Sequence, residues 1–371
     1  KASHRKLLID LLTLPTAPFC EQHVAAYIRA WAGKRRALKL STDRYGNLRL
    51  TLKRGTRPPA RPIVFSAHMD HPGFEAERML GPKRLRALWR GGVTASYFDD
   101  ARVRFHDGKR WIKGRITAKT TRLERNRERV VSVDVQTRAD VPPGAIGMWD
   151  LPDPRIRGTR IHARGCDDIA GLAAVLAAMD ELCKTRAAVN VIATFTRAEE
   201  VGFIGAMAAC RSGLIPKRAR VVAVECSSEI PGVAMGNGPI LRVGDASSIF
   251  TPGLTAYCGQ VAEDIARLDP TFFWQRKLMD GGTCESTAFC EGGYEATGLC
   301  IALGNYHNMD RKRQVIAPEY VDLRDWERLV TWFVALAESK RKIATGNPVL
   351  KQGLMNLRKE WTPLLTSKKL K

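Results

Sequence analysis

The sequence has little of what marks membrane, secreted or disulfide-stabilised proteins. No apolar run approaches the roughly 18 residues that a membrane-spanning helix needs. Residues 1–12 also lack the small-residue cleavage site of a signal peptide. The nine cysteines are an odd number and form no CxxC or CxxxC pair, which indicates reduced thiols and not a disulfide framework. We therefore predict a soluble, cytoplasmic protein with no membrane partner.

Acidic side chains are scarce relative to basic ones. The chain has 60 Lys and Arg against 38 Asp and Glu, a formal net charge of +22. Such a surplus can indicate a nucleic-acid partner. However, the sequence contains no zinc finger, no RNP-like aromatic strand and no basic recognition helix. A solvated basic surface or attraction for acidic peptides explains the charge as well, and we expect no nucleic-acid partner.

The hydrophobic pattern changes twice along the 371 residues. Apolar residues alternate with polar ones between residues 72 and 160, with Gly and Pro turns and no amphipathic helix, which predicts a small all-β domain. Before and after it, buried strands alternate with helices. We expect strands at 61–67, 189–196, 220–224 and 297–303, and helices at 6–14, 21–32, 171–184, 201–212 and 319–343.

This alternation predicts an α/β fold with a mixed, mostly parallel sheet flanked by helices and with an inserted all-β domain. The catalytic domain would comprise residues 1–71 and 163–345. The insert would be residues 72–162, and residues 346–371 would be a basic, weakly patterned C-terminal tail.

Five short segments place metal-ligand side chains where the predicted strands end or a helix begins. They are His68-Met69-Asp70, Gly165 to Gly171 with Asp167 and Asp168, Arg197 to Gly202 with Glu199 and Glu200, Val221 to Glu225, and Gly304 to Asn308 with Tyr306 and His307. Open α/β sheets bind ligands at the carboxyl ends of their strands, so the five segments can meet in one crevice.

Each segment alone has an ordinary structural explanation. A single His near a strand end is more often structural than a ligand, Asp-Asp before a helix is usually an N-cap, and Glu-Glu is usually a solvated face. The explanation weakens when all five occur in order. Two histidines and three carboxylates suit a pair of divalent zinc, cobalt or manganese ions. Of two adjacent glutamates, one can bind metal while the other handles a proton.

The order H-x-D, D-D-x-x-G, E-E-x-G, acidic residue and His resembles the co-catalytic zinc peptidases of clan MH, with their phosphorylase/hydrolase-like fold. Within the clan, AHMDHPGFEA, RAEEVGFIGA, DRYGNLRL and the β insert resemble the deblocking, tetrahedral (TET) aminopeptidases, a glutamyl aminopeptidase-like family. The resemblance covers roughly residues 5–340. Glu225 stands where the branch usually has Asp, and Cys284 departs from its usual Gly-Thr-Asp, which suggests a divergent subgroup.

The resemblance implies a role for each candidate residue. Glu199 would be the general base that activates a metal-bridging water, and Asp70 would orient His68. Asp168 and Tyr306 would lie behind the ligands or near the substrate. The metal ligands would be His68, Asp167, Glu200, Glu225 and His307, with Asp167 bridging two divalent ions, most simply zinc.

The same resemblance implies that the enzyme removes N-terminal residues from peptides. It also implies a homo-oligomer, from a dimer to a dodecamer, that assembles largely through the insert. The insert could also act as a lid. Two alternatives remain open. The clan shares its metal centre with dipeptidases and N-acyl amino acid deacylases, so similarity does not separate these reactions. A non-catalytic basic binding protein is the other alternative, although all the ligand positions and Glu199 are intact.

Overall fold

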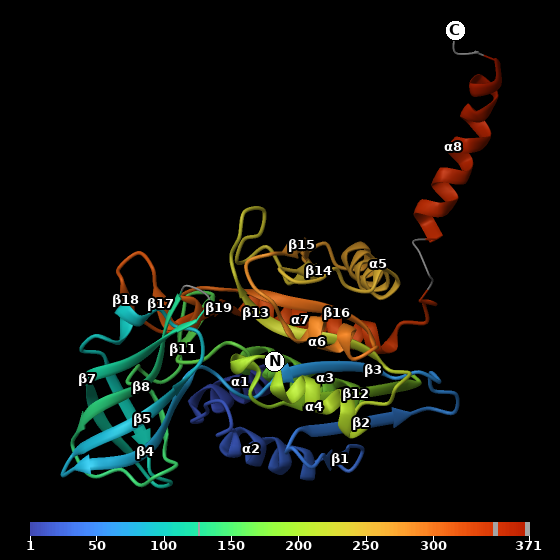
Figure 1. Ribbon diagram of the computed structural model, residues 1–371. Coiled ribbons are helices and arrows are strands. Elements are labelled where there is room, and N and C mark those ends of the chain that lie inside the picture. The colour runs from blue at the N-terminus through green and yellow to red at the C-terminus, as the bar shows by residue number, and fades with distance from the viewer. Residues whose placement is uncertain (125–126, 344–347, 368–371) are drawn as a thin grey trace.

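The computed structural model describes residues 1–124, 127–343 and 348–367. Two bodies lie side by side, an α/β domain and a β-barrel (Figure 1). The helices are α1 (Ala2–Thr13), α2 (Gln22–Gly33), α3 (Ile169–Leu182), α4 (Ile204–Ser212), α5 (Pro252–Leu268), α6 (Glu285–Glu291), α7 (Leu323–Glu338) and α8 (Pro348–Ser367), with short 3-10 turns at Ala95–Phe98, Glu199–Val201 and Tyr306–Asn308.

An eight-stranded sheet forms the centre of the α/β domain, in the order β1-β2-β12-β3-β13-β16-β14-β15. Strands β12, β3, β13 and β16 run parallel, and antiparallel pairings join β2 and β14 to the two sides of this parallel core. The strands are β1 (Lys39–Thr42), β2 (Leu48–Arg54), β3 (Ile63–His68), β12 (Val189–Thr196), β13 (Arg220–Ser228), β14 (Ile240–Asp245), β15 (Gln275–Met279) and β16 (Glu295–Leu303).

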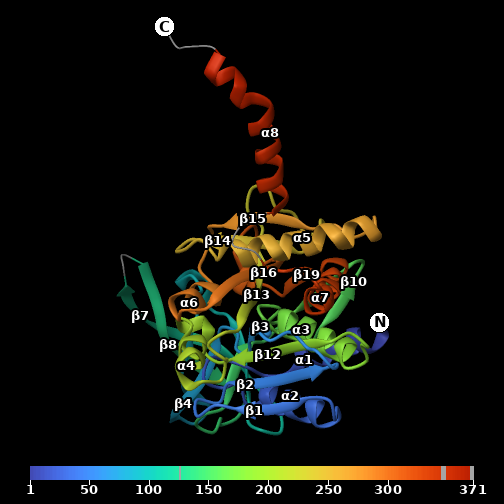
Figure 2. The same ribbon diagram turned by 90° about the vertical axis from the view of Figure 1, so that its right-hand side faces the viewer.

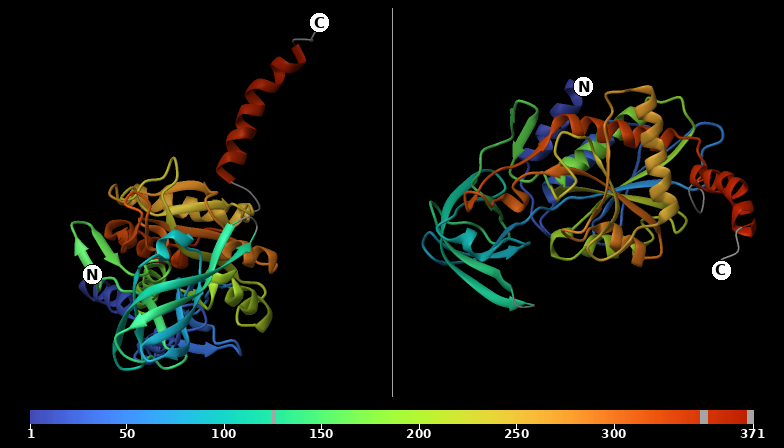
Figure 3. Two further views of the ribbon diagram at one scale, coloured as in Figure 1. Left: turned by 60° about the vertical axis from the view of Figure 1, so that its left-hand side comes forward. Right: turned by 90° about the horizontal axis from the view of Figure 1, so that it is seen from above.

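Helices cover both faces of this sheet (Figures 2 and 3). Helices α1, α2, α3, α5 and α7 share one apolar core with the sheet, whereas α4 and α6 pack on the opposite face around Val64, Ile192 and Val221. Burial on both faces explains why the central strands are continuous apolar runs such as VNVIATFT. The predicted α/β fold with a mostly parallel sheet is confirmed.

The second body is a closed barrel in the order β4-β5-β8-β7-β6-β9 with its own aromatic core, which includes Phe74, Trp89, Phe98 and Trp149. Its strands are β4 (Gly73–Gly81), β5 (Arg84–Arg90), β6 (Arg102–His106), β7 (Trp111–Glu124), β8 (Arg127–Thr137) and β9 (Ile146–Trp149). The predicted all-β character of this region is confirmed, and no α-helix interrupts its described residues.

Five short strands of the described chain form two further small sheets. Strands β10 (Arg155–Arg157), β11 (Arg160–Ala163) and β19 (Glu319–Asp322) form a small sheet, and β17 (Met309–Asp310) pairs with β18 (Val315–Ile316). The expected helix over 319–343 therefore begins late, because Glu319 to Asp322 pair with β11 and Asp322 caps α7 by accepting a hydrogen bond from the Arg324 N–H.

The C-terminal segment, which we expect to be a basic, weakly patterned tail, contains a helix. Pro348–Ser367 forms α8, which stands clear of both bodies in Figures 1 and 2. Leu354, Leu357 and Trp361 are more than half exposed on it, and their spacing of three and four residues is helical. No helix in the described part of the chain is long and apolar enough to cross a membrane.

Candidate metal centre

The parallel strands deliver the candidate side chains to one edge of the sheet. His68 is the last residue of β3, Glu225 lies near the end of β13, and Glu199 and His307 follow β12 and β16 within four residues. Because these four strands run in the same direction, their carboxyl ends meet at one edge. Asp167 joins them from the turn between β11 and α3.

Six of the predicted residues form what we call the central cluster: His68, Asp167, Glu199, Glu200, Glu225 and His307. One Asp167 carboxylate oxygen, Oδ1, lies 3.6 Å from Nε2 of His68. Its other oxygen, Oδ2, lies 3.8 Å from Nε2 of His307. The aspartate therefore faces both histidines, as a residue bridging two cations must.

Two groups of three potential ligands share this aspartate. The first consists of His68, Asp167 and Glu225, with 3.7 Å between His68 Nε2 and Glu225 Oε2. The second consists of His307, Asp167 and Glu200, with 3.1 Å between His307 Nε2 and Glu200 Oε2. Glu199 lies at the edge, 3.8 Å from His68 Nε2. A third group, His68 with Glu199 and Glu200, is also within ligand distance.

Both histidines point Nε2 into the cluster. The Nδ1 of His68 contacts the carbonyl oxygen of Asp70 at 3.1 Å, and the Nδ1 of His307 contacts that of Gly92 at 2.8 Å. A carbonyl can only accept, so Nδ1 carries a proton, and in the neutral ring Nε2 is the nitrogen that can bind a cation. The Gly92 carbonyl belongs to the loop after barrel strand β5, so the barrel contributes directly to the site.

The polar atoms of the cluster fit cations. Buried ligand atoms without a hydrogen-bond partner include His68 Nε2, Asp167 Oδ1, Glu200 Oε1, Glu225 Oε1 and His307 Nε2. Such atoms are costly when left unpaired. Among the described residues no Lys or Arg forms an ion pair with these carboxylates, whose ion pairs are with His68 and His307. Two divalent ions would supply the missing positive charge.

Burial and neighbouring carboxylates raise the pKa of Glu199, Glu200 and Glu225. Burial acts on Asp167 as well, but His68 and His307 outweigh it and lower the pKa of this carboxyl group. The pKa of Glu199 lies well above its usual value, because burial and the nearby Glu225 and Glu200 outweigh His68. Burial also raises the pKa of Glu285, which accepts a hydrogen bond from Ser66 beneath the cluster, to about 7. Burial lowers the pKa of His307, but Glu200 and Asp167 more than compensate and raise it to about 9. The metal-free cluster therefore holds protons where cations would otherwise sit.

Asp70 lies behind the cluster, where its two carboxylate oxygens accept the N–H groups of Glu199 at 3.0 Å and Glu200 at 3.1 Å. Its Oδ1 is 3.6 Å from His68 Nδ1, so it contacts the expected histidine as well. Asp168 is buried at the start of α3 but makes no side-chain cap, and Cys226 Sγ lies 3.6 Å from its Oδ1. Tyr306 stacks on the His307 ring, with 3.7 Å between centroids.

Two supporting carboxylates were missed in the sequence. Glu319 is fully buried and accepts hydrogen bonds from the N–H groups of Cys166, Asp167 and His307. Glu21 accepts those of Phe19 and Ala198 and pairs with Arg197 beside Glu199. The capping position of Asp322 was the sequence signal that could have separated Glu319 from α7.

A pocket of about 180 Å³ opens beside the cluster. Its lining includes Glu199, Glu200 and Glu225 together with Arg242 and Arg311. Arg242 is buried, donates to Ser227 Oγ at 2.9 Å and leaves its Nε without a partner. In the described residues no carboxylate pairs with this guanidinium, so it can receive an anionic group from a ligand.

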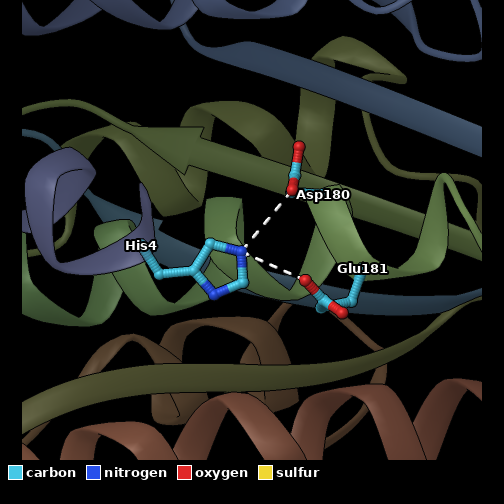
Figure 4. Close-up of side chains that lie close together, drawn as sticks. All are labelled: His4, Asp180 and Glu181. Atoms are coloured by element: carbon cyan, nitrogen blue, oxygen red, sulfur yellow. Dashed lines mark ion pairs between the residues drawn. The ribbon is translucent and has the colours of Figure 1, made fainter. Parts of the chain in front are cut away.

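A second group of potential ligands, the peripheral cluster, consists of His4, Asp180 and Glu181 (Figure 4). The His4 Nε2 lies 3.5 Å from Asp180 Oδ2 and 3.2 Å from Glu181 Oε1. Cations already pair with these carboxylates: Arg35 and Lys184 with Asp180, and Lys1 with Glu181. The charges are balanced without a metal, so this cluster is an ion-pair network that joins α1 and α2 to α3.

Comparison with known proteins agrees with this geometry. A family model described as M42 glutamyl aminopeptidase matches residues 46–312, well over half of the chain. This chain belongs to the M42 glutamyl aminopeptidase family. It is therefore a peptide hydrolase, an aminopeptidase of a metal-dependent family.

More distant relatives share the fold. A curated protein of Acetivibrio thermocellus with a provisional aminopeptidase name is 26% identical over 73% of this chain and 82% of its own length. The TET1 peptidase of Pyrococcus horikoshii, which can assemble into a tetrahedron or a large octahedral shell, is 22% identical with a TM-score of 0.73, covering 90% of this chain and 99% of that one. An aminopeptidase of Desulfurococcus kamchatkensis is 23% identical with a TM-score of 0.73, covering 91% and 95%.

Proposed function

We propose that this M42 aminopeptidase binds two divalent cations in the central cluster and removes N-terminal residues from peptides. The supporting observation is the uncompensated set of two histidines and four carboxylates whose ligand atoms share Asp167. His68, Asp167 and Glu225 would hold one cation, and His307, Asp167 and Glu200 the other. Zinc suits this donor set, and cobalt or manganese would fit as well.

Each protein group would then have a defined task. When bound, a pair of divalent ions supplies Lewis acidity that polarises a carbonyl and lowers the pKa of water. Glu199 would accept the proton of the attacking water and return it to the leaving amine. Asp70 would hold Glu199 and Glu200 in place through their backbone N–H groups, and Tyr306 would fix the His307 ring by stacking.

Metal analysis beside a panel of aminoacyl-amide and N-acylated substrates tests this proposal. We expect two metal ions per chain and cleavage of substrates with a free amino group only. Cleavage of N-acylated substrates alone would instead favour the deacylase alternative. Binding of nucleic acid in a salt-dependent manner, without peptidase activity, would favour the non-catalytic alternative.

The variant Glu199→Gln tests the role of the base. Gln keeps the size of the side chain but cannot accept a proton, so we expect kcat to fall by about 10²- to 10⁴-fold, the usual contribution of general acid–base catalysis. The metal content should stay at two ions per chain. Activity close to the wild type in this variant would mean that another group takes the proton.

We also propose that the enzyme prefers an acidic N-terminal side chain, because the Arg242 guanidinium in the pocket next to the cluster has no carboxylate partner among the described residues and its Nε makes no hydrogen bond. The change Arg242→Gln should lower kcat/KM for glutamyl substrates by about 10- to 100-fold, the usual range for a charged hydrogen bond. Leucyl substrates should be affected little. Arg311→Gln, at the exposed rim, is the matched control and should have a smaller effect. Equal losses for both substrates would argue against this preference.

Finally, we propose that the chain forms a homo-oligomer, on the basis of its similarity to TET1, which assembles into shells. Light scattering after size-exclusion chromatography would give the mass directly. A monomer at micromolar concentration would contradict the proposal.

A further inference from the structure

Strand β19 lies between two of the ligand-bearing loops. In the small sheet Glu319 is opposite Ala163, the last residue of β11, from which the chain leads directly to Asp167. On its other side Tyr320 pairs with Gly304, at the end of β16, from which the chain leads to His307. Glu319 therefore occupies a strand that pairs with the chain leading into both loops.

The Glu319 carboxylate uses both oxygens to hold these loops. Oε2 accepts the N–H of Cys166 at 2.6 Å and of Asp167 at 3.1 Å, and Oε1 accepts the N–H of His307 at 2.8 Å. The side chain is fully buried, so water cannot replace it as an acceptor. Removing one acceptor would leave a buried donor unpaired, which destabilises the loop that carries this donor.

The loop that carries His307 needs such support. His307 has φ 53° and ψ 35°, and Asn305 and Asn308 also have positive φ values of 54° and 65°. Left-handed backbone is unfavourable for residues other than glycine and persists where surrounding contacts hold it. The hydrogen bond from the His307 N–H to Glu319 is such a contact.

We infer that Glu319 is a positioning residue that holds Asp167 and His307 together and so builds the second cation site. This inference rests on the proposed dinuclear function. Glu319 holds two of the three ligands of the second site, His307 and Asp167, but only Asp167 of the first. His68 and Glu225 of the first site are held by β3 and β13. Loss of Glu319 should therefore weaken the second site more than the first.

The variant Glu319→Gln tests this inference. Gln keeps one acceptor oxygen, and its amide N–H₂ would face a backbone N–H donor, so one loop loses its partner. At a fixed, limiting concentration of free zinc we expect metal content to fall from two ions to about one per chain. We expect kcat to fall at least 100-fold while the KM changes little, and excess zinc should restore part of both metal content and kcat.

Two further variants separate positioning from general destabilisation. Asp325→Asn is the matched control, because Asp325 is also buried and accepts two backbone N–H groups, those of Gly236 and Gly238, away from the cluster. It should lower the melting temperature but leave two metals bound. Glu319→Asp keeps both acceptor oxygens on a shorter chain and should bind the second zinc at least 10-fold more weakly than the wild type, with the first nearly unchanged.

The outcomes are distinguishable. If the wild-type protein binds no pair of metals, the proposed function itself fails. If the wild type binds two zinc ions and Glu319→Gln binds both with unchanged affinity, only the positioning role of Glu319 is overturned. If Glu319→Gln does not fold, the zinc titration of Glu319→Asp decides, and equal weakening of both sites there would also overturn the inference.

Discussion

The central and peripheral clusters contain the same types of side chain at nearly the same distances. Nitrogen-to-oxygen separations are 3.1–3.8 Å in the first and 3.2–3.5 Å in the second. They differ in their neighbours. Arg35, Lys184 and Lys1 balance the peripheral carboxylates, whereas no such cation pairs with the central ones in the described chain. Ligand type and distance are therefore not sufficient to identify a metal site, and the balance of charge decides.

The largest difference between the clusters should come from removing one carboxylate charge in each. Asp167→Asn removes the group that faces both histidines, so we expect loss of both metals and a fall in kcat/KM of about 10³-fold or more, because metal-assisted catalysis supplies several kcal/mol. Asp180→Asn should leave metal content and activity unchanged. Metal analysis and steady-state kinetics of both variants test this difference. Loss of metal from Asp180→Asn would contradict the assignment of the peripheral cluster as an ion-pair network.

Removal of the metals should make the stability of the protein depend on pH. The pKa of Glu199 is raised well above its usual value, and that of Glu285 to about 7, mainly by burial, against about 4.3 in an unfolded chain. The folded metal-free state then binds more protons than the unfolded state, so this stability is present below about pH 4 and is lost as the pH rises through 7.

His71, which lies beside the cluster, acts in the opposite direction. Burial, and then His307, lowers the pKa of His71 to about 4, so its contribution grows as the pH rises from about 4 to 6.5. Groups with a raised pKa are more numerous in and around the cluster, so we expect the melting temperature of the metal-free protein to fall between pH 5 and pH 8. The metal-loaded protein should change much less. Parallel thermal melts test this, and equal slopes would count against cations in the central cluster.

A smaller effect is expected on folding stability at the peripheral cluster. Burial raises the pKa of Asp180, but Lys184 and Arg35 outweigh burial and lower this pKa to about 2. Its stabilising contribution is therefore present above about pH 4 and is lost as the pH falls towards 2. At pH 7 Asp180→Asn should lower the free energy of unfolding by about 1–3 kcal/mol in a urea titration. An unchanged unfolding midpoint would show that the ion pairs contribute nothing.

The smallest effect should follow from Lys184→Ala. The Lys184 side chain is 65% exposed, and Asp180 keeps Arg35 as a partner. Exposed ion pairs contribute about 0–1 kcal/mol and weaken as salt increases. We therefore expect a small loss of stability that disappears at 1 M salt. A loss that persists at 1 M salt would assign Lys184 a packing role.

The sequence was informative where function depends on the ends of buried strands. The apolar runs of β3 and β12 stop next to His68 and Glu199, and parallel order then brings the ligand types together. The sequence did not single out Glu319, because the helical pattern of α7 extends back through the residues of β19. Arg242 lies on β14, an unpredicted strand, and its place in the pocket depends on tertiary packing. The Gly92 carbonyl has no sequence signal at all, since every residue has such a group.

The Gly92 carbonyl makes the candidate metal centre of the α/β domain depend on the barrel. Because the loop after β5 accepts the hydrogen bond that sets the His307 tautomer, the barrel cannot be exchanged or deleted as an independent module. A graft that shifts this loop by one hydrogen-bond length would leave the imidazole free to turn its protonated nitrogen inward. Engineering of the barrel for new assemblies must therefore preserve the backbone around Gly92, even where every side chain there is replaced.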